Sequence, residues 1–258
     1  MKKTALITGA SSGIGYELSK IFAKNNYDLV LVSRDANKLK SISEEIKKQH
    51  DTQIRVIPKD LCISSAPQEL YDEINADNIS IDVLVNNAGI GSHGKFTDSK
   101  SEEQANLIQL NITSLTMLCK KFGADMVKRG SGRILNIAST AAFQAGPLMS
   151  TYYASKAYVL LFSEGLRHEL KNDGVTVTVL CPGPTRTEFF KRSNMIGTRL
   201  ERSPHTMSAA RVAATGFSGL MNGKTIVIPG LINNLLAFSV RITPRRVITG
   251  ITHFLNQR

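Results

Sequence analysis

The chain has 258 residues, of which 42% are hydrophobic and 21% charged, and its formal net charge is +11. This composition is typical of a soluble globular protein, and no apolar stretch approaches the roughly 20 residues that would be needed to span a bilayer. The positive charge is concentrated in residues 191–258, which hold ten Lys or Arg and one acid, Glu201. These basic residues are scattered without a nucleic-acid motif, so we expect no nucleic-acid partner. A solvated basic surface and an anionic partner both remain open.

Strand-length apolar segments alternate with longer helical patterns along the chain. The strands are predicted at 4–8, 28–33, 53–58, 83–86, 132–138, 176–181 and 225–228, and the helices at 14–25, 36–49, 66–76, 101–129, 152–172 and 208–221. Such alternation favours βαβ units. We therefore expect one α/β domain over 1–258, with a doubly wound sheet of seven mainly parallel strands and helices on both faces.

Two segments fall outside this pattern. Residues 190–222 are predicted to include a variable lid over a substrate, because 189–207 is polar and has no clear period. Residues 231–258 form a basic C-terminal tail whose apolar and Arg positions suit an amphipathic helix on a membrane surface. Packing against the domain or against another copy is the alternative that we favour.

The three cysteines, Cys62, Cys119 and Cys181, are far apart and show no metal-ligand spacing, so we expect free thiols and no metal site. The N-terminal apolar run stops at once in a glycine-rich turn and lacks a signal-peptide core. A cytoplasmic location is expected.

A glycine-rich turn lies between the first strand and the first helix. Glycine is needed where backbone turns tightly and approaches a pyrophosphate closely, and a helix N-terminus offers free N–H groups to phosphate. A plain tight turn is the alternative interpretation. The candidate cofactor residues of this turn are Gly9, Ser11, Ser12, Gly13, Ile14 and Gly15.

The end of the second strand distinguishes NAD from NADP. NAD sites usually place a carboxylate there, whereas an Arg accommodates the 2′-phosphate of NADP. This chain has Ser33 at the expected carboxylate position, followed by Arg34, which predicts NADP(H). Asp35 complicates the choice, but it could instead cap the next helix. Lys38 adds charge nearby.

The turns after the third and fourth strands hold further candidates. Asp60 and Leu61 could contact the adenine, and the small residues of Asn86-Asn87-Ala88-Gly89 would let backbone lie close to a ligand. Each is also compatible with a helix cap or an ordinary turn.

Tyr152 and Lys156 are one helical turn apart, and Ser139 ends a predicted strand upstream. A tyrosine is a poor acid at its usual pKa near ~10, but a neighbouring ammonium lowers the pKa of a phenol. Ser139 could donate to a substrate oxygen. Tyr153 is a competing candidate, although it is not four residues from Lys156.

Taken together, these motifs resemble the short-chain dehydrogenase/reductase family, in its NADP-preferring form. The resemblance covers residues 4 to about 190 and implies a Rossmann-type fold. It further implies that Tyr152 is the general acid/base, that Lys156 also binds the nicotinamide ribose, and that Ser139 stabilises the substrate oxygen. Further residues are implied only by this resemblance: Asn111 for a proton relay, Pro182 and Gly183 beside the nicotinamide, and Thr187 on its carboxamide.

The expected function is NADPH-dependent reduction of a carbonyl to an alcohol. Residues 140–149 and 189–207 are expected to wall the substrate pocket. The walls are mostly apolar, which suggests a hydrophobic ketone or acyl substrate. The apolar wall residues are Ala141, Ala142, Phe143, Leu148, Met149, Phe189, Phe190 and Met195. His93 could reach this pocket, although a solvent-exposed loop histidine is the favoured interpretation. The alternative function is a non-catalytic NADP(H)-binding redox sensor. Family members commonly assemble through the helices at 101–129 and 152–172, so a homodimer or homotetramer is expected.

Overall fold

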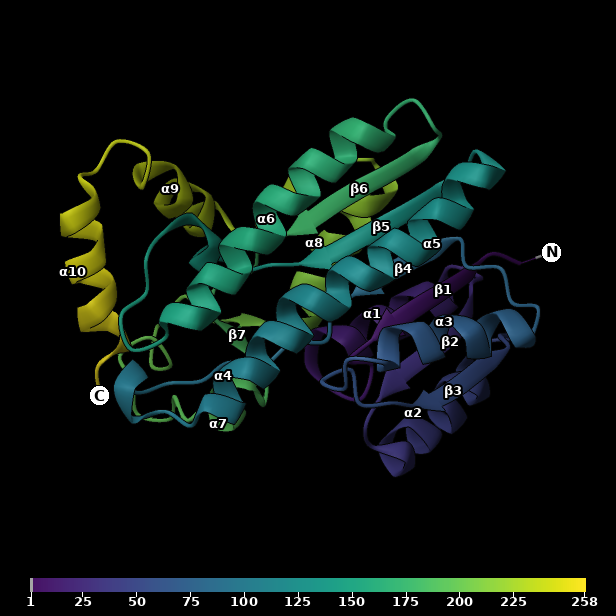
Figure 1. The fold of residues 1–258 in the computed structure, drawn as a ribbon, viewed down its shortest axis with the longest axis horizontal. Helices are drawn as coiled ribbons and strands as arrows, with labels where there is room; N and C mark the ends of the chain where they lie inside the picture. The colour runs from purple at the N-terminus through teal and green to yellow at the C-terminus, as the bar shows by residue number, and fades with distance from the viewer. Residues whose placement is uncertain (1) are drawn as a thin grey trace.

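The computed structural model describes residues 2–258 and contains one seven-stranded sheet. All neighbouring strands run parallel, in the order β3-β2-β1-β4-β5-β6-β9 (Figure 1). Their bounds are Thr4–Thr8 (β1), Asp28–Ser33 (β2), Ile54–Pro58 (β3), Val83–Asn86 (β4), Gly132–Ile137 (β5), Val175–Leu180 (β6) and Ile226–Val227 (β9). The predicted fold is confirmed, and each strand lies within one residue of its predicted bounds.

Helices cover both faces of this sheet, as the apolar strands require. On one face α3 (Ala66–Ala76), α5 (Leu115–Arg129) and α6 (Ser150–Leu170) build a core that includes Leu70, Phe122 and Val159. On the other face α1 (Gly13–Lys24), α2 (Ala36–Gln49) and α8 (Ala209–Met221) contribute Leu18, Leu39 and Val212 to a second core. The two cores hold the sheet rigid, so the loops at its carboxyl edge are well positioned for a site.

The helix predicted over 101–129 is interrupted. Regular α-helix is present in α4 (Ser101–Ile108) and α5, but Gln109–Ser114 between them forms a π-helix. A π-helix widens the backbone by one residue per turn and commonly occurs at functional sites. It contains Asn111, whose side chain it directs inward, where it is buried.

The segment expected to be a lid divides into two parts. The first contains β7 (Thr185–Arg186), the short α7 (Phe189–Arg192) and β8 (Met207–Ser208), and β7 and β8 pair as a separate two-stranded sheet. The second part is α8, which packs against α1 and the sheet. The prediction of a lid over 190–222 is therefore wrong from residue 209 onward, because the apolar face of α8 belongs to the core.

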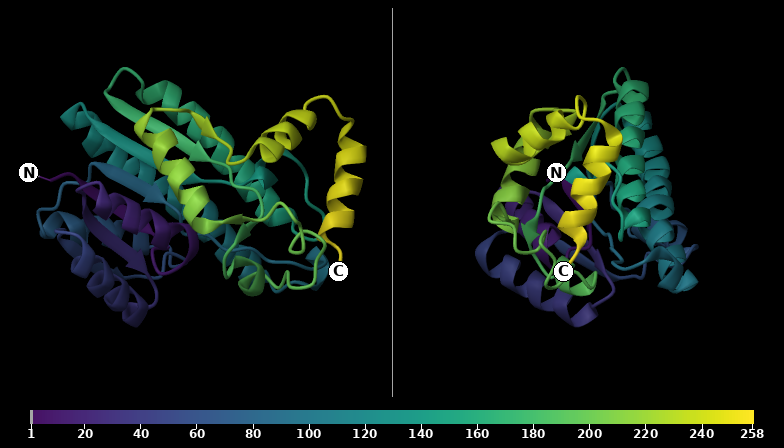
Figure 2. Two further views of the ribbon diagram at one scale, coloured as in Figure 1. Left: turned by 180° about the vertical axis from the view of Figure 1, so that it is seen from behind. Right: turned by 90° about the vertical axis from the view of Figure 1, so that its left-hand side faces the viewer.

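The tail forms two helices, α9 (Leu231–Ser239) and α10 (Arg245–Asn256), which lie at the end of the molecule remote from β1 and β3 (Figures 1 and 2). Two short 3₁₀ helices, η1 (Phe96–Asp98) and η3 (Thr140–Phe143), complete the structure. Within residues 2–258, no helix combines the length and the hydrophobicity that crossing a membrane would require.

Candidate active site

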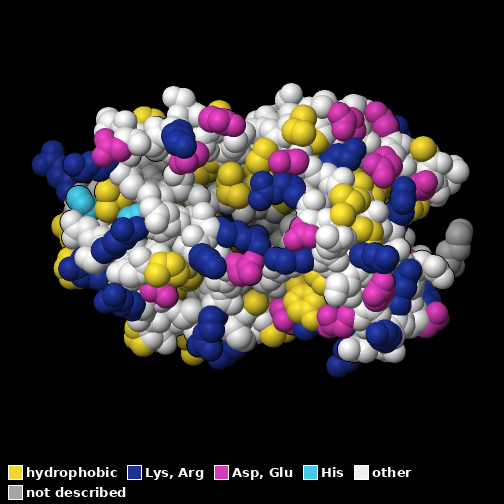
Figure 3. Space-filling view, turned by 90° about the horizontal axis from the view of Figure 1, so that it is seen from below, with side chains coloured by type: hydrophobic (Ala, Val, Ile, Leu, Met, Phe, Trp, Pro, Cys, Tyr) yellow, Lys and Arg dark blue, Asp and Glu magenta, His cyan; other side chains and the backbone are white. Residues whose placement is uncertain are grey.

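A cavity of about 670 Å³ opens at the carboxyl edge of the sheet, where ligands of open parallel sheets collect. Its wall extends from the turn after β1, past the ends of β2 to β6, to α7 and α10. A hollow near the middle of the lower face has Lys and Arg side chains along its edges (Figure 3). The cavity is of a size typical for small-molecule sites, which are about 300–1,000 Å³.

The glycine-rich turn forms one end of this cavity. Gly9 has a φ of +65°, and a Cβ on it would lie 2.7 Å from Asn87 Nδ2. The Asn87 amide in turn donates to the carbonyl oxygens of Thr8 at 2.9 Å and Gly9 at 3.1 Å. A side chain at Gly15 would collide with the same amide and with the Gly9 carbonyl. The Asn87 amide therefore fixes the backbone of the turn, and the outer side of the turn is open to a ligand.

Most of the predicted cofactor residues line this cavity. Those that do so are Gly9, Ser11, Ser12, Gly13, Ile14, Ser33, Arg34, Asp60, Leu61, Asn87, Ala88, Gly89, Tyr152, Lys156, Pro182, Gly183 and Thr187. Gly15 does not, because it packs behind the turn. Asn111 does not line the cavity either: its amide accepts from Ile90 N at 3.0 Å and donates to Ile90 O and Ser155 Oγ.

The end of β2 presents a cluster of polar groups to the cavity. Asp35 caps α2 by accepting from Lys38 N at 3.0 Å, which confirms its structural interpretation. Arg34 is exposed, and its guanidinium lies 3.9 Å from the Asp60 carboxylate. The hydroxyl of Ser33 is buried and has no hydrogen-bond partner within the described residues. An unpaired hydroxyl next to an exposed cation fits a bound phosphate group, and together with the open glycine turn it fits a dinucleotide phosphorylated on its ribose.

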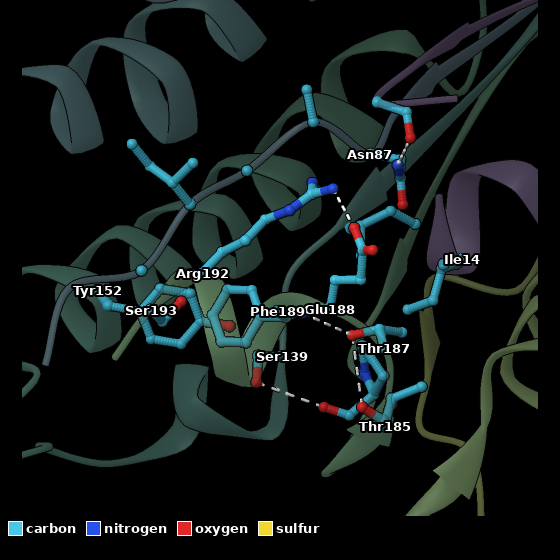
Figure 4. A pocket seen from close by; sticks show the side chains of 18 of the residues that line it. Ile14, Asn87, Ser139, Tyr152, Thr185, Thr187, Glu188, Phe189, Arg192 and Ser193 are labelled. Carbon is cyan, nitrogen blue, oxygen red and sulfur yellow. Dashed lines mark hydrogen bonds and ion pairs between the residues drawn. The ribbon is translucent and has the colours of Figure 1, made fainter. Parts of the chain in front are cut away.

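Ser139, Tyr152 and Lys156 meet at the other end of the cavity (Figure 4 labels the first two). Ser139 lies two residues beyond the end of β5, where it caps η3 by accepting from Ala141 N at 3.1 Å. The Lys156 ammonium lies 5.7 Å from the centre of the Tyr152 ring and donates to Ile137 O at 2.9 Å. Phe189 covers the ring of Tyr152, with 5.2 Å between the two ring centres. The three predicted residues therefore share one partly apolar compartment.

The acid–base properties of this compartment differ from the sequence-based expectation. Burial raises the pKa of Tyr152 well above its usual value, and the nearby Ser139 hydroxyl only partly opposes this. Burial also lowers the pKa of Lys156 to about 8. We expected Lys156 to lower the pKa of the phenol, and that expectation is wrong for the protein without a ligand. The cause is that a desolvated compartment disfavours both charged forms.

The cavity wall also includes residues that sequence reasoning did not identify, among them Thr252 and Leu255 of α10. No local signal in the sequence distinguishes these two, because the tertiary fold alone brings α10 to the cavity. Gln144, beyond η3, and Ser193, after α7, lie in the two segments that were expected to wall the pocket. The Ser193 hydroxyl is buried and has no hydrogen-bond partner among residues 2–258. The expected walls Ala141, Met149, Phe189, Phe190 and Met195 do line the cavity, whereas Ala142, Phe143 and Leu148 do not.

Asn256 connects α10 to the rest of this wall. Its amide donates to Pro147 O at 2.9 Å, its Oδ1 accepts from the Tyr153 hydroxyl at 3.4 Å, and its carbonyl contacts His93 Nε2 at 2.6 Å. His93 thus does not line the cavity. Tyr153, the competing candidate for the acid, has its hydroxyl engaged in this structural network.

The sequence comparison agrees with the geometry. A family model described as short chain dehydrogenase matches residues 3–195. The chain belongs to the short-chain dehydrogenase family. This match includes the glycine turn, Ser139, Tyr152 and Lys156, and it stops before α8, α9 and α10.

Curated relatives and solved structures are similar over most of this chain. Mouse 17-beta-hydroxysteroid dehydrogenase type 3 is 36% identical over 75% of the chain, and very-long-chain 3-oxoacyl-CoA reductase of Anas platyrhynchos is 33% identical over 85%. The chain spans 64% and 70% of their lengths. A short-chain dehydrogenase from Sphingobium yanoikuyae in complex with NADPH is 31% identical, with a TM-score of 0.84 and coverage of 96% of this chain and 95% of that one.

Proposed function

We propose that this chain is an NADPH-dependent oxidoreductase that reduces a carbonyl group to an alcohol, with Tyr152 as the general acid/base. The observation that carries the proposal is that Ser139, Tyr152 and Lys156 share one cavity with the glycine-rich turn. A nucleotide held at the turn could then place its reactive end beside a phenol. We retain a cytoplasmic location as part of this proposal.

The chain's own residues would bind NADP(H) from one end of the cavity to the other. Backbone of Gly9 to Ile14 would hold the pyrophosphate at the N-terminus of α1. Ser33 and Arg34 would hold the 2′-phosphate, and Lys156 with Gly183 and Thr187 would position the nicotinamide. When bound, the cofactor supplies the hydride. Binding of NADPH rather than NADH is supported by the unpaired Ser33 hydroxyl and by the structurally similar NADPH complex.

The protein would supply the proton. Because burial keeps Tyr152 protonated at neutral pH, its hydroxyl can donate to the oxygen of a ketone as negative charge develops there. Ser139 would donate a second hydrogen bond to the same oxygen. Lys156 lies behind the ring and would stabilise the phenolate that remains, since an opposite charge nearby favours the ionised form.

The substrate is proposed to be a hydrophobic ketone or acyl compound. The compartment around Tyr152 is built from Met149, Phe189, Phe190, Met195 and Leu200. The relatives act on steroid and 3-oxoacyl compounds according to their names, and a Comamonas testosteroni alcohol dehydrogenase specific for bulky-bulky ketones is 31% identical with a TM-score of 0.79. The similarity covers 93% of this chain and 92% of the Comamonas testosteroni protein.

The proposal is tested by following NADPH oxidation with steroid ketones, bulky aryl ketones and 3-oxoacyl thioesters. Turnover with at least one class is expected. Tight NADPH binding without turnover on any class would instead support a redox sensor. No specific feature of the site favours that alternative.

Replacing Arg34 with Ala tests the cofactor choice. We expect the KM for NADPH to rise roughly 10–100-fold, because charge-assisted hydrogen bonds contribute about 1.5–3 kcal/mol. The KM for NADH should hardly change, since its ribose carries no phosphate. Lys40→Ala removes an exposed cation outside the cavity and is the matched control. Equal losses for both cofactors would show that Arg34 does not read the phosphate.

We also propose that the chain forms a homodimer or homotetramer through α5 and α6. Three apolar side chains are exposed there, Met117, Tyr158 and Leu161, and Tyr158 links the two helices through a 3.0 Å contact with Thr116 Oγ1. Sedimentation equilibrium should give a multiple of the 28.2 kDa chain mass, and Leu161→Glu should reduce it. A wild-type monomer would contradict this prediction.

A further inference from the structure

The helices α9 and α10 expose an extensive apolar surface. Leu231, Leu235 and Phe238 follow the spacing of one helical face, with exposed fractions of 84%, 68% and 61%, and Ile242 follows in the next turn at 75%. Only Asn233 and Ala237 of α9 are buried against the body of the protein. Among residues 2–258, the other side chains of α9 are exposed or only partly buried.

The outer side of α10 carries a second row of exposed apolar residues. Val247, Ile251 and Phe254 are each more than half exposed and lie on one side of the helix. Large exposed apolar patches on soluble proteins mark interaction sites. We use the name docking surface for the exposed apolar residues of both helices and of the turn between them. These residues are Leu231, Ile232, Leu235, Leu236, Phe238, Ile242, Val247, Ile251 and Phe254.

The charged residues within 231–258 are all basic. Arg241, Arg245 and Arg246 are exposed in the turn and at the start of α10, and none of them forms an ion pair within the described residues. Arg199 stacks over Phe254, 4.1 Å from its ring centre. Residues 231–258 contain four Arg and no Asp or Glu. This distribution of charge favours an anionic partner.

We propose that the docking surface binds an anionic phospholipid membrane. An apolar face bordered by basic residues is the pattern of helices that lie in the membrane interface, where apolar side chains enter the acyl boundary and Arg contacts the headgroups. A second copy of the chain fits less well. A two-fold contact through the same face would bring the arginines of the two copies together with no acid in 231–258 to pair with them.

Membrane binding at the docking surface has a consequence for the cavity, because the opposite side of α10 lines it. Thr252 and Leu255 line the cavity, while Ile251 and Phe254, next to them in sequence, belong to the docking surface. A membrane on the docking surface would therefore lie one helix diameter from the substrate compartment. This arrangement suits a ketone dissolved in the bilayer, but binding itself does not depend on the proposed function.

Vesicle co-sedimentation of the full-length protein tests the proposal without any enzymatic readout. We expect the protein to pellet with equimolar phosphatidylcholine and phosphatidylglycerol vesicles and far less with pure phosphatidylcholine. Changing Arg241, Arg245 and Arg246 together to Gln should lower the partition coefficient on the order of 100-fold, given about 1 kcal/mol for each basic residue at an anionic surface. The same change at the exposed residues Lys40, Lys47 and Lys48 is the charge-matched control and should have little effect.

The apolar contribution is tested in the same assay. Leu235→Ser with Phe238→Ser should lower binding at least tenfold, because each side chain loses its transfer into the acyl region. Ile63→Ser with Phe96→Ser changes side chains of similar exposure elsewhere and serves as the control. Unchanged thermal melting would show that the variants fold.

Three outcomes would overturn the proposal. The first is no pelleting with either kind of vesicle, and the second is an equal loss of binding in the control variants. The third is self-association without lipid that Leu235→Ser with Phe238→Ser abolishes, which would assign the docking surface to a second copy of the chain.

Discussion

Replacing Tyr152 with Phe is expected to lower kcat for NADPH-dependent ketone reduction by about 10²–10⁴-fold, the usual contribution of a positioned acid. The change removes one oxygen and leaves the ring packed against Phe189, so the fold and the affinity for NADPH should be retained. Stopped assays of product formation and fluorescence titration with NADPH measure the two effects separately.

Tyr153→Phe is the matched control for this experiment. The Tyr153 hydroxyl donates to Asn256 and not to the compartment around Ser139, so turnover should persist with at most a modest loss of stability. Turnover that survives in Tyr152→Phe and disappears in Tyr153→Phe would mean that the acid has been assigned to the wrong tyrosine.

Replacing Lys156 with Met should abolish turnover and, at neutral pH, increase the free energy of unfolding. Burial lowers the pKa of Lys156 from 10.5 to about 8, so the folded protein carries an unfavourable charge wherever the lysine is protonated. Removing that charge should stabilise the fold by roughly 2 kcal/mol, after an allowance for the lost hydrogen bond to Ile137 O. The wild-type protein is thus expected to be less stable than the variant. Its active site keeps a buried charge that catalysis needs and that folding alone would not select.

The pH dependence identifies the cause of this stabilisation. Below about pH 8 both the folded and the unfolded protein hold the proton, and the penalty of the buried charge is present in full. As the pH rises from about 8 to 10.5, the folded state loses the proton first and the penalty disappears. The melting temperatures of wild type and variant should therefore converge across this range. A constant difference, or the same convergence for the exposed Lys120→Met control, would contradict the explanation.

Much of the fold could be predicted because its signals are local. Apolar runs such as 29–32 mark strands buried on both faces, and the spacing of Gly9, Gly13 and Gly15 marks a turn that must stay open. Tyr152 and Lys156 were linked by helical periodicity alone. In each case a few residues close together in the sequence determine the local structure, and the tertiary contacts favour the same structure.

The remaining features depend on contacts between distant segments. The π-helix at Gln109–Ser114 has no distinct sequence pattern, and it is stabilised by the bonds of Asn111 to Ile90 and Ser155. The packing of α8 and the cavity wall from α10 are likewise tertiary effects. The direction of the Tyr152 pKa shift was mispredicted because helix spacing places a cation nearby but says nothing of the burial that outweighs it.

The two sides of α10 constrain how this helix can change. Its inner side carries Thr252, Leu255 and Asn256, and its outer side carries Val247, Ile251 and Phe254. One inserted or deleted residue turns everything beyond it by about 100° around the helix axis. Such a change would turn residues of the inner side of α10 away from the cavity and bring other residues to it. It would also separate Asn256 from Pro147 and Tyr153. Point substitutions can alter either side alone, whereas a change in length alters both, so the length of this helix should be far more restricted in evolution than its composition.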